Sequence, residues 1–134
     1  MDENNRFEDW QYPEINEGKP TKYNWVVQYV QNFHLGFKTD IGAFSYINAK
    51  YGVKIEDFVQ VGSHCSIYSI STIDDKKGEV ILKRRCRWGS HSVVLPGVTI
   101  GETFEYLTFP DFALNENSGL RIFFACKSQF FKGL

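Results

Sequence analysis

The sequence predicts an all-β protein, a parallel β-helix made of hexapeptide repeats. Between residues 41 and 102 an apolar residue recurs every six positions, often followed by Gly, and a small residue stands four places after it. A period of six fits neither the α-helical repeat of about 3.6 residues nor an array of hairpins. It suits a coil in which each hexapeptide supplies one short strand and one turn, with three hexapeptides closing a triangular turn.

Nine hexapeptide units follow this rule, with two interruptions. INAKYG, from Ile47, is followed by a two-residue slip at Val53 and Lys54, and an excursion, IDDKKGEVI, precedes LKRRCR. The leading residue of each unit should point into the prism, and the residue four places later should be a compact second interior residue. The expected leading residues are Ile41, Ile55, Val61, Ile67, Leu82, Val94 and Ile100, and the expected compact ones are Ser45, Val59, Cys65, Ser71, Cys86, Ser92 and Val98.

Three further residue types fit the same interior. Trp88 takes a leading position, so a role in the core is expected rather than stacking on an adenine. Cys65 and Cys86 are expected to be buried packing residues, because a buried thiol behaves as a small hydrophobe. Glycines directly follow a leading residue at four places, where backbone crowding or unusual dihedrals would favour them: Gly42, Gly62, Gly89 and Gly101.

The 134 residues are expected to form a single domain. Residues 1–40 are a lead-in, in which residues 23–30 fit either a strand or a short helix. Residues 41–102 form the β-helix. Residues 103–134 break the hexapeptide rule and hold seven of the twelve Phe, which suits an aromatic C-terminal cap over open strand edges. A product of a shifted reading frame and a shortened relative are the alternatives for this segment.

Composition limits the class of protein. The net charge of -1 provides no overall field for nucleic acid, and no apolar run is long enough to cross a bilayer. The chain opens without a secretory signal, so a cytoplasmic protein is expected. Three cysteines without CxxC spacing and three histidines form no recognisable zinc pattern, so no metal is expected.

The strings VGSHCSIYS, STIDDKKGEV and above all WGSHSVVLPGVTIGE resemble the bacterial hexapeptide acyltransferases that modify sugars of surface polysaccharides. The resemblance covers roughly residues 41–102. It implies a left-handed β-helix, a homotrimer, and acetyl-CoA bound in the groove between neighbouring subunits. It further implies transfer of the acetyl group to a hydroxyl or amine of a sugar or nucleotide-linked sugar.

Two departures from the family pattern matter. The family's Asn-His-Pro string, whose His is the general base, is replaced by Ser71, Thr72, Ile73 and Asp74, and nothing after Thr103 matches the family's GAGSVV-like and GVPAK-like strings. A non-catalytic or truncated member of the fold with impaired coenzyme binding is therefore the alternative. A hexapeptide protein of the carbonic-anhydrase type would need three metal-binding His at subunit interfaces, and the His spacing does not follow that pattern.

Acetyl transfer to an alcohol or amine needs a general base, and histidine suits this role because its ordinary pKa is near neutrality. The candidates are His34, His64 and His91. His64 and His91 each take the fourth place of a hexapeptide, which faces outward at a turn. His64 is preferred because it precedes the strand IYS and the excursion, and His91 is its alternative. A solvated turn residue is the competing interpretation of His64.

Two charged groups could bind ligands. Asp74 and Asp75, in the excursion, could orient a histidine or accept a hydrogen bond from a sugar hydroxyl, or they could belong to an ordinary turn. A basic ridge could meet the phosphates of coenzyme A or of a nucleotide-sugar, or it could be a solvated face. A nucleic-acid site is not expected, because the ridge is short and lacks interleaved aromatic residues. The ridge consists of Lys83, Arg84, Arg85 and Arg87.

Overall fold

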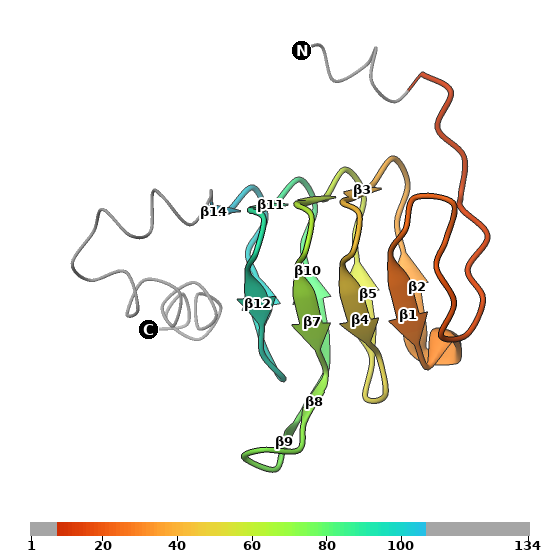
Figure 1. Ribbon diagram of the computed structural model, residues 1–134. Helices are drawn as coiled ribbons and strands as arrows, with labels where there is room; N and C mark the ends of the chain where they lie inside the picture. The colour runs from red at the N-terminus through yellow and green to blue at the C-terminus, as the bar shows by residue number, and fades with distance from the viewer. Residues whose placement is uncertain (1–7, 107–134) are drawn as a thin grey trace.

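The computed structural model describes residues 8–106. This part of the chain is all-β, with short strands and one turn of 3₁₀-helix, η1 (Val30–Asn32). Figure 1 shows the strands side by side, with the lead-in at one end and residue 106 at the other. Within the described residues, no helix has the length and apolar character required to cross a membrane.

Three four-stranded parallel sheets make up the body of the molecule. The first sheet contains β1 (Val26–Gln28), β4 (Tyr46–Asn48), β7 (Ser66–Tyr68) and β12 (Val93–Val94). The second contains β2 (Phe33–Leu35), β5 (Val53–Ile55), β10 (Val80–Leu82) and β13 (Thr99–Ile100). The third contains β3 (Asp40–Ile41), β6 (Gln60–Val61), β11 (Arg87–Trp88) and β14 (Glu105–Tyr106). The chain visits them in rotation, and we call one passage through all three a coil.

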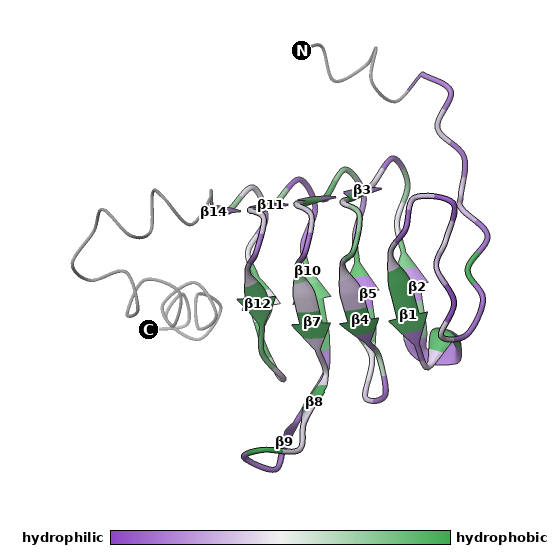
Figure 2. Cartoon of the chain, viewed as in Figure 1, coloured by the Kyte–Doolittle hydropathy of each residue, from purple (hydrophilic) through white to green (hydrophobic). Residues whose placement is uncertain are grey.

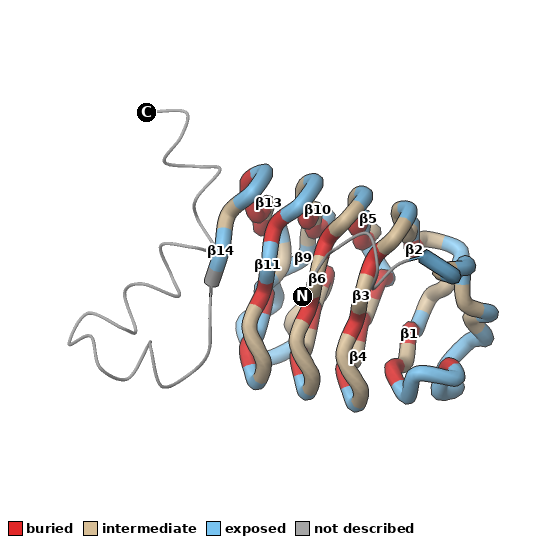
Figure 3. Tube along the Cα trace, turned by 90° about the horizontal axis from the view of Figure 1, so that it is seen from above, coloured by how far each residue is buried: buried red, intermediate tan, exposed pale blue. Residues whose placement is uncertain are grey.

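The register stacks equivalent apolar residues of successive coils. In the first sheet Val27 pairs with Ile47, Ile47 with Ile67, and Ile67 with Val94. Every leading residue expected to be interior is buried, and Trp88, only 1% exposed, belongs to the same core. Figure 3 shows these buried segments recurring from coil to coil. The parallel sheets and this core are compatible with the β-helix that the hexapeptide period predicts.

The compact positions follow the prediction with one exception. Ser45, Val59, Cys65, Cys86, Ser92 and Val98 are all buried, whereas Ser71 is only half-buried. Ser71 departs because it lies in β8 (Ile70–Ser71), which pairs antiparallel with β9 (Lys76–Lys77) in a hairpin outside the three sheets. The excursion therefore begins within the hexapeptide that contains Ser71.

Both interruptions of the repeat lie at one corner, between the first and second sheets. Ile47 and Ile55 are eight positions apart, Ile67 and Leu82 fifteen, and Val94 and Ile100 six. The slip at Val53 and the excursion are thus two insertions of different length at the same turn. The longer one forms the β8–β9 hairpin, which projects from the body in Figure 1. We call this the hairpin corner.

The sheets begin before residue 41, where the hexapeptide repeat was first recognised in the sequence. Residues 23–30, left open between strand and helix, contain β1, so the first coil begins at Val26. The lead-in turns back on this coil, where Gly18 N–H donates to Val27 O at 2.9 Å. Trp25, 2% exposed, fills the core at this end. Figure 2 shows the hydrophobic residues concentrated on the strands and a largely hydrophilic lead-in. The expected cap over residues 103–134 lies almost wholly outside the described residues.

The cysteine thiols provide a test of this core. Burial, with a smaller contribution from the Glu56 carboxylate, raises the pKa of Cys86 to about 12. An unfolded thiol ionises near pH 9, so above that pH the unfolded state binds fewer protons than the folded state. The stability that Cys86 supplies is therefore lost between about pH 9 and 12. The unfolding free energies of the parent and of Cys86→Ala can be measured with denaturant from pH 8 to about pH 10.5. We expect the value for the parent to fall more steeply with pH, and the two slopes to differ by up to ~1.4 kcal/mol per pH unit. Parallel curves would contradict the buried thiol.

Candidate functional site

The two outward histidines of the repeat lie at the corner between the third and first sheets. His64 and His91 occupy the same place in successive coils, and Phe44 occupies it one coil earlier. All three have positive φ, of 64° at Phe44, 58° at His64 and 59° at His91. In this left-handed conformation each side chain points away from the core, and all three are exposed. We call this the histidine corner.

The rings of the histidine corner form a column. The imidazoles of His64 and His91 are stacked, with centroids 4.7 Å apart and planes 10° apart. The Phe44 ring lies 5.1 Å from that of His64 on its other side. Each imidazole therefore has a defined orientation and an edge open to solvent, so either could accept a proton from a ligand that approaches this corner.

The acidic candidates lie at a different corner. Asp74 and Asp75 belong to the β8–β9 hairpin, at the far end of β7 from His64 (Figure 1). A hydrogen bond from the Ser71 side chain is the main cause that lowers the pKa of Asp74, and the ammonium of Lys76, 3.6 Å away, adds to it. Asp74 is thus a charged hydrogen-bond acceptor at neutral pH. Asp74 is close to His64 in the sequence but not in the structure.

The basic ridge occupies the third corner, between the second and third sheets. Arg84 and Arg85 lie in the turn between β10 and β11, and both are exposed. Their guanidinium carbons lie 5.4 Å and 4.8 Å from the centroid of the Phe58 ring. The Arg84 backbone N–H donates to Glu56 Oε1 at 3.0 Å, which fixes the turn. We call this the basic corner.

The sequence alone did not reveal the aromatic support of the basic corner. Phe58 precedes Arg85 by one coil and shares its positive φ, with values of 62° and 66°. The expectation that the ridge lacks interleaved aromatic residues at its own face is therefore wrong, because the aromatic residue comes from the neighbouring coil and not from the same stretch of chain. The signal was available: Phe58 and Arg85 both take the fourth place of their hexapeptides.

A single chain does not bring the candidate groups together. The pair His64 and His91, the two aspartates and the basic residues lie at the three different corners of the coil. One strand runs between each corner and the next, and a strand rises about 3.3 Å per residue. The side chains at different corners of one chain are therefore too far apart to form hydrogen bonds with one another. A site that used all three groups would need corners from more than one copy of the chain.

His34 has a different setting from the other histidines. It lies on the outer face of β2, and two adjoining hollows of about 310 Å³ each meet at its side chain. Lys54, Glu56 and Arg84 line the first hollow, and Tyr51 and Glu79 line the second. His34 therefore lines a hollow together with Arg84 of the basic corner, whereas His64 and His91 are exposed at the histidine corner.

Comparisons with protein-family models, with curated proteins and with solved structures find no match to this chain. Among residues 8–106, no three or more His, Cys, Asp or Glu side chains are grouped so that they could hold a metal ion. The features of the chain that bear on its function are the three corners, the His34 hollows and the hexapeptide strings.

Proposed function

We propose that this chain is an acetyltransferase with a left-handed parallel β-helix, which moves an acetyl group from acetyl-CoA to a hydroxyl or amine of a sugar or nucleotide-linked sugar. The pathway is cell-surface polysaccharide biosynthesis, with the enzyme in the cytoplasm. The observation that carries the proposal is three parallel sheets visited in rotation, with a hexapeptide core and a hairpin excursion at one corner. The resemblance of WGSHSVVLPGVTIGE to hexapeptide acyltransferases supports it.

The basic corner suits the phosphates of the acyl donor. Guanidinium groups bind phosphate through two parallel N–H donors, and a ring beneath a guanidinium restricts its orientation. Phe58 gives Arg84 and Arg85 such a support, and Arg87 lies on the adjoining strand β11. Lys83 begins the same turn. The chain thus supplies positive charge for the phosphates of the donor. A histidine removes the proton of the acceptor as the acceptor attacks the thioester carbonyl, the C–S bond then breaks, and the coenzyme A thiolate that leaves takes the proton from the imidazolium.

Titration calorimetry with acetyl-CoA tests the proposal without knowledge of the acceptor. The parent should bind acetyl-CoA, and Arg84→Gln with Arg85→Gln should weaken binding by roughly tenfold or more, since charge-assisted contacts are the strong ones. Lys19→Gln with Lys22→Gln, at two exposed positions of the lead-in, removes the same charge and is the control that should bind as the parent does. A parent that binds no acetyl-CoA would favour the alternative, a non-catalytic or truncated member of the fold.

Association of several copies follows from the separation of the three corners. Because His64, Asp74 and Arg84 lie at different corners, we expect the active unit to be a homotrimer in which corners of neighbouring copies meet. Sedimentation velocity at micromolar concentration should give the mass of three chains. A monomer at that concentration would contradict the shared site and leave the His34 hollows as the site within one chain.

His64 is the proposed general base, and its replacement should be severe. We expect His64→Asn to lower kcat by roughly 100-fold, the scale of general-base catalysis, with the affinity for acetyl-CoA unchanged. Asn is chosen because it tolerates the positive φ of this position and cannot accept the proton. His91→Asn, at the same corner, is the matched control, and its effect on kcat should be much smaller. A loss of activity in His34→Ala, with His64→Asn active, would move the base to the second sheet.

A further inference from the structure

The two His34 hollows adjoin on the outer face of the second sheet, and each has a volume of about 310 Å³. The first reaches Arg84 at the basic corner, and the second reaches Lys50 and Glu79 at the hairpin corner. Because the side chain of His34 lines both hollows, one ligand can occupy the two together and contact this imidazole at its middle.

The His34 hollows contain hydrogen-bond acceptors that the described part of the chain leaves available. Within residues 8–106 the Glu79 carboxylate forms no ion pair or hydrogen bond. The side-chain amide of Asn32 donates to Lys50 O at 3.0 Å, which orients the amide and leaves its carbonyl oxygen as an acceptor. Asp57 Oδ1 accepts from Phe37 N–H at 2.8 Å, and its other oxygen remains for a ligand.

Hydrogen-bond donors line the same two hollows. The Arg84 guanidinium forms no ion pair within residues 8–106 and is supported from below by the Phe58 ring. The ammonium groups of Lys50 and Lys77 lie 5.8 Å and 5.4 Å from the centroid of the Tyr51 ring. Tyr51, 40% exposed, adds a hydroxyl and an apolar ring surface to the second hollow.

This mixture of groups is suited to a neutral ligand with many hydroxyls. An anion would face the carboxylate of Asp57 in the first hollow and that of Glu79 in the second. A cation would face Arg84 in the first hollow and Lys50 in the second. A hydroxyl group both donates and accepts, so a sugar can use the donors and the acceptors of each hollow without meeting a like charge.

The size of each hollow matches one sugar unit. An engineered cavity of about 150 Å³ in another protein holds one benzene molecule. Each His34 hollow has about twice that volume, which leaves room for a six-membered ring with its hydroxyl groups. Most of the charged side chains that line the hollows are exposed, so a longer chain of sugars can continue into solvent at either end.

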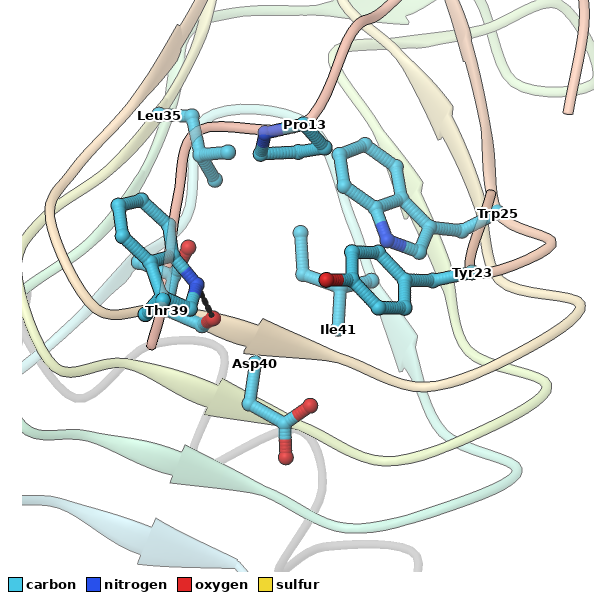
Figure 4. A pocket seen from close by; sticks show the side chains of 8 residues that line it. Pro13, Tyr23, Trp25, Leu35, Thr39, Asp40 and Ile41 are labelled. Atoms are coloured by element: carbon cyan, nitrogen blue, oxygen red, sulfur yellow. Dashed lines mark hydrogen bonds between the residues drawn. The ribbon is translucent and has the colours of Figure 1, made fainter. Parts of the chain in front are cut away.

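The hollow at the N-terminal end of the molecule has a different character. Its volume is about 150 Å³, and aromatic and aliphatic side chains form most of its wall (Figure 4). On one side of it the Trp10 indole N–H donates to Thr39 O at 2.8 Å. Such a wall supplies few partners for hydroxyl groups, so the His34 hollows are the better site for a sugar.

We propose that the His34 hollows bind two adjacent units of a neutral oligosaccharide, one unit in each hollow. The identification of this oligosaccharide as the acetyl acceptor rests on the proposed function, whereas its binding does not. As the acceptor, it would lie between the hairpin corner, with Asp74 and Asp75, and the basic corner proposed for the coenzyme phosphates. A nucleotide-linked sugar is the poorer ligand, because its phosphates would face Asp57 or Glu79.

Calorimetric titration with maltose, cellobiose and N,N′-diacetylchitobiose, and with glucose and N-acetylglucosamine, tests the two-unit site. We expect at least one disaccharide to bind with a Kd of roughly 1 mM or less, and about tenfold more tightly than its own monosaccharide, because the second unit fills the second hollow. No saturable binding of any disaccharide, or equal binding of disaccharide and monosaccharide, would overturn the proposal. Tighter binding of glucose 6-phosphate than of every disaccharide would identify an anion site instead.

Two variants locate the bound disaccharide. Glu79→Ala removes a charged acceptor from the second hollow and should weaken binding by about fivefold or more, and His34→Ala, common to both hollows, should also weaken it. Glu14→Ala removes an exposed carboxylate of the lead-in that lines neither hollow and should bind as the parent does. All three should keep the far-UV circular dichroism of the parent. Unchanged binding in Glu79→Ala and His34→Ala would refute the site.

The titrations contain no acetyl-CoA, so the sugar site and the proposed acetyl transfer can fail separately. A chain that binds a disaccharide but no acetyl-CoA would keep the sugar site and lose the transferase. A chain that binds acetyl-CoA but none of the disaccharides would lose the sugar site alone.

Discussion

Val94→Asp is expected to prevent folding. Val94 is fully buried and pairs with Ile67 in the first sheet, where both belong to the hydrophobic core. A carboxylate there would have no hydrogen-bond donor to replace water, and leaving it charged or protonating it each costs several kcal/mol. Domains of this size are stable by only about 5–15 kcal/mol, so one such group removes most of that margin. The purified variant should lack the cooperative thermal unfolding transition of the parent in circular dichroism.

Val93→Asp is the matched control for this substitution. Val93 is the neighbouring residue in the same strand, but its side chain is 40% exposed because successive residues of a strand face opposite sides. Its change to Asp should alter the unfolding free energy by less than about 1 kcal/mol. If the two variants were equally stable, the inward and outward faces assigned to the first sheet would be wrong.

The core could be predicted from the sequence because burial in this fold repeats with the period of the chain. Each hexapeptide places its leading residue toward the interior whatever the neighbouring coils contain, so Ile41, Val61 and Ile100 were identified without knowledge of the register. Local sequence is enough for this property. The first coil was identified only in part: Ile41 was predicted, whereas Val27 and Leu35, which pair with Ile47 and Ile55, were not. The large residues Trp25 and Phe33 also belong to the core of this coil and do not follow the aliphatic rule.

The arrangement of the candidate site could not be predicted in the same way. Which residues of successive coils become neighbours depends on the length of the insertion between them, and that length differs from coil to coil. His64 and His91 are 27 positions apart and their rings stack, whereas Phe44 and His64 are 20 positions apart and also touch. Asp74, only ten positions from His64, lies at another corner. Sequence distance is therefore a poor guide to proximity on the outer surface.

The αL turns explain why bulky residues can occupy these corners. A positive φ is unfavourable for a side chain with a Cβ, yet Phe44, Phe58, His64, Arg85 and His91 all adopt it. The adjacent coils fix the backbone of each turn through bonds such as His64 N–H to Ala43 O at 3.0 Å and His91 N–H to Ser63 O at 3.0 Å. These backbone hydrogen bonds between coils offset the cost of the positive φ, and the side-chain rings stack on the outer surface of the coils.

Gly62→Ala is expected to destabilise the fold strongly, although it adds a single methyl group. Its φ is not positive, so crowding and not conformational freedom explains the glycine. A Cβ at this position would lie 2.4 Å from Ser90 N and 2.7 Å from Ser90 Cα, which is far inside van der Waals contact with the backbone of the next coil. Relief requires the two coils to move apart, which would stretch the bond from Gly62 N–H to Trp88 O, now 2.7 Å.

Overpacking of this kind costs about 1–3 kcal/mol or more, and we expect Gly62→Ala to lie at the upper end because the obstacle is backbone. For a domain of this size the melting temperature should fall by roughly 10 °C or more in a thermal scan. Gly18→Ala is the control: its Cβ meets nothing within 4 Å, and its φ of 66° leaves only a conformational cost. That cost is of the order of 1 kcal/mol, so Gly18→Ala should melt within a few degrees of the parent. If Gly62→Ala melted as high as Gly18→Ala, the coils would not be in the close contact on which the ring columns at the corners depend.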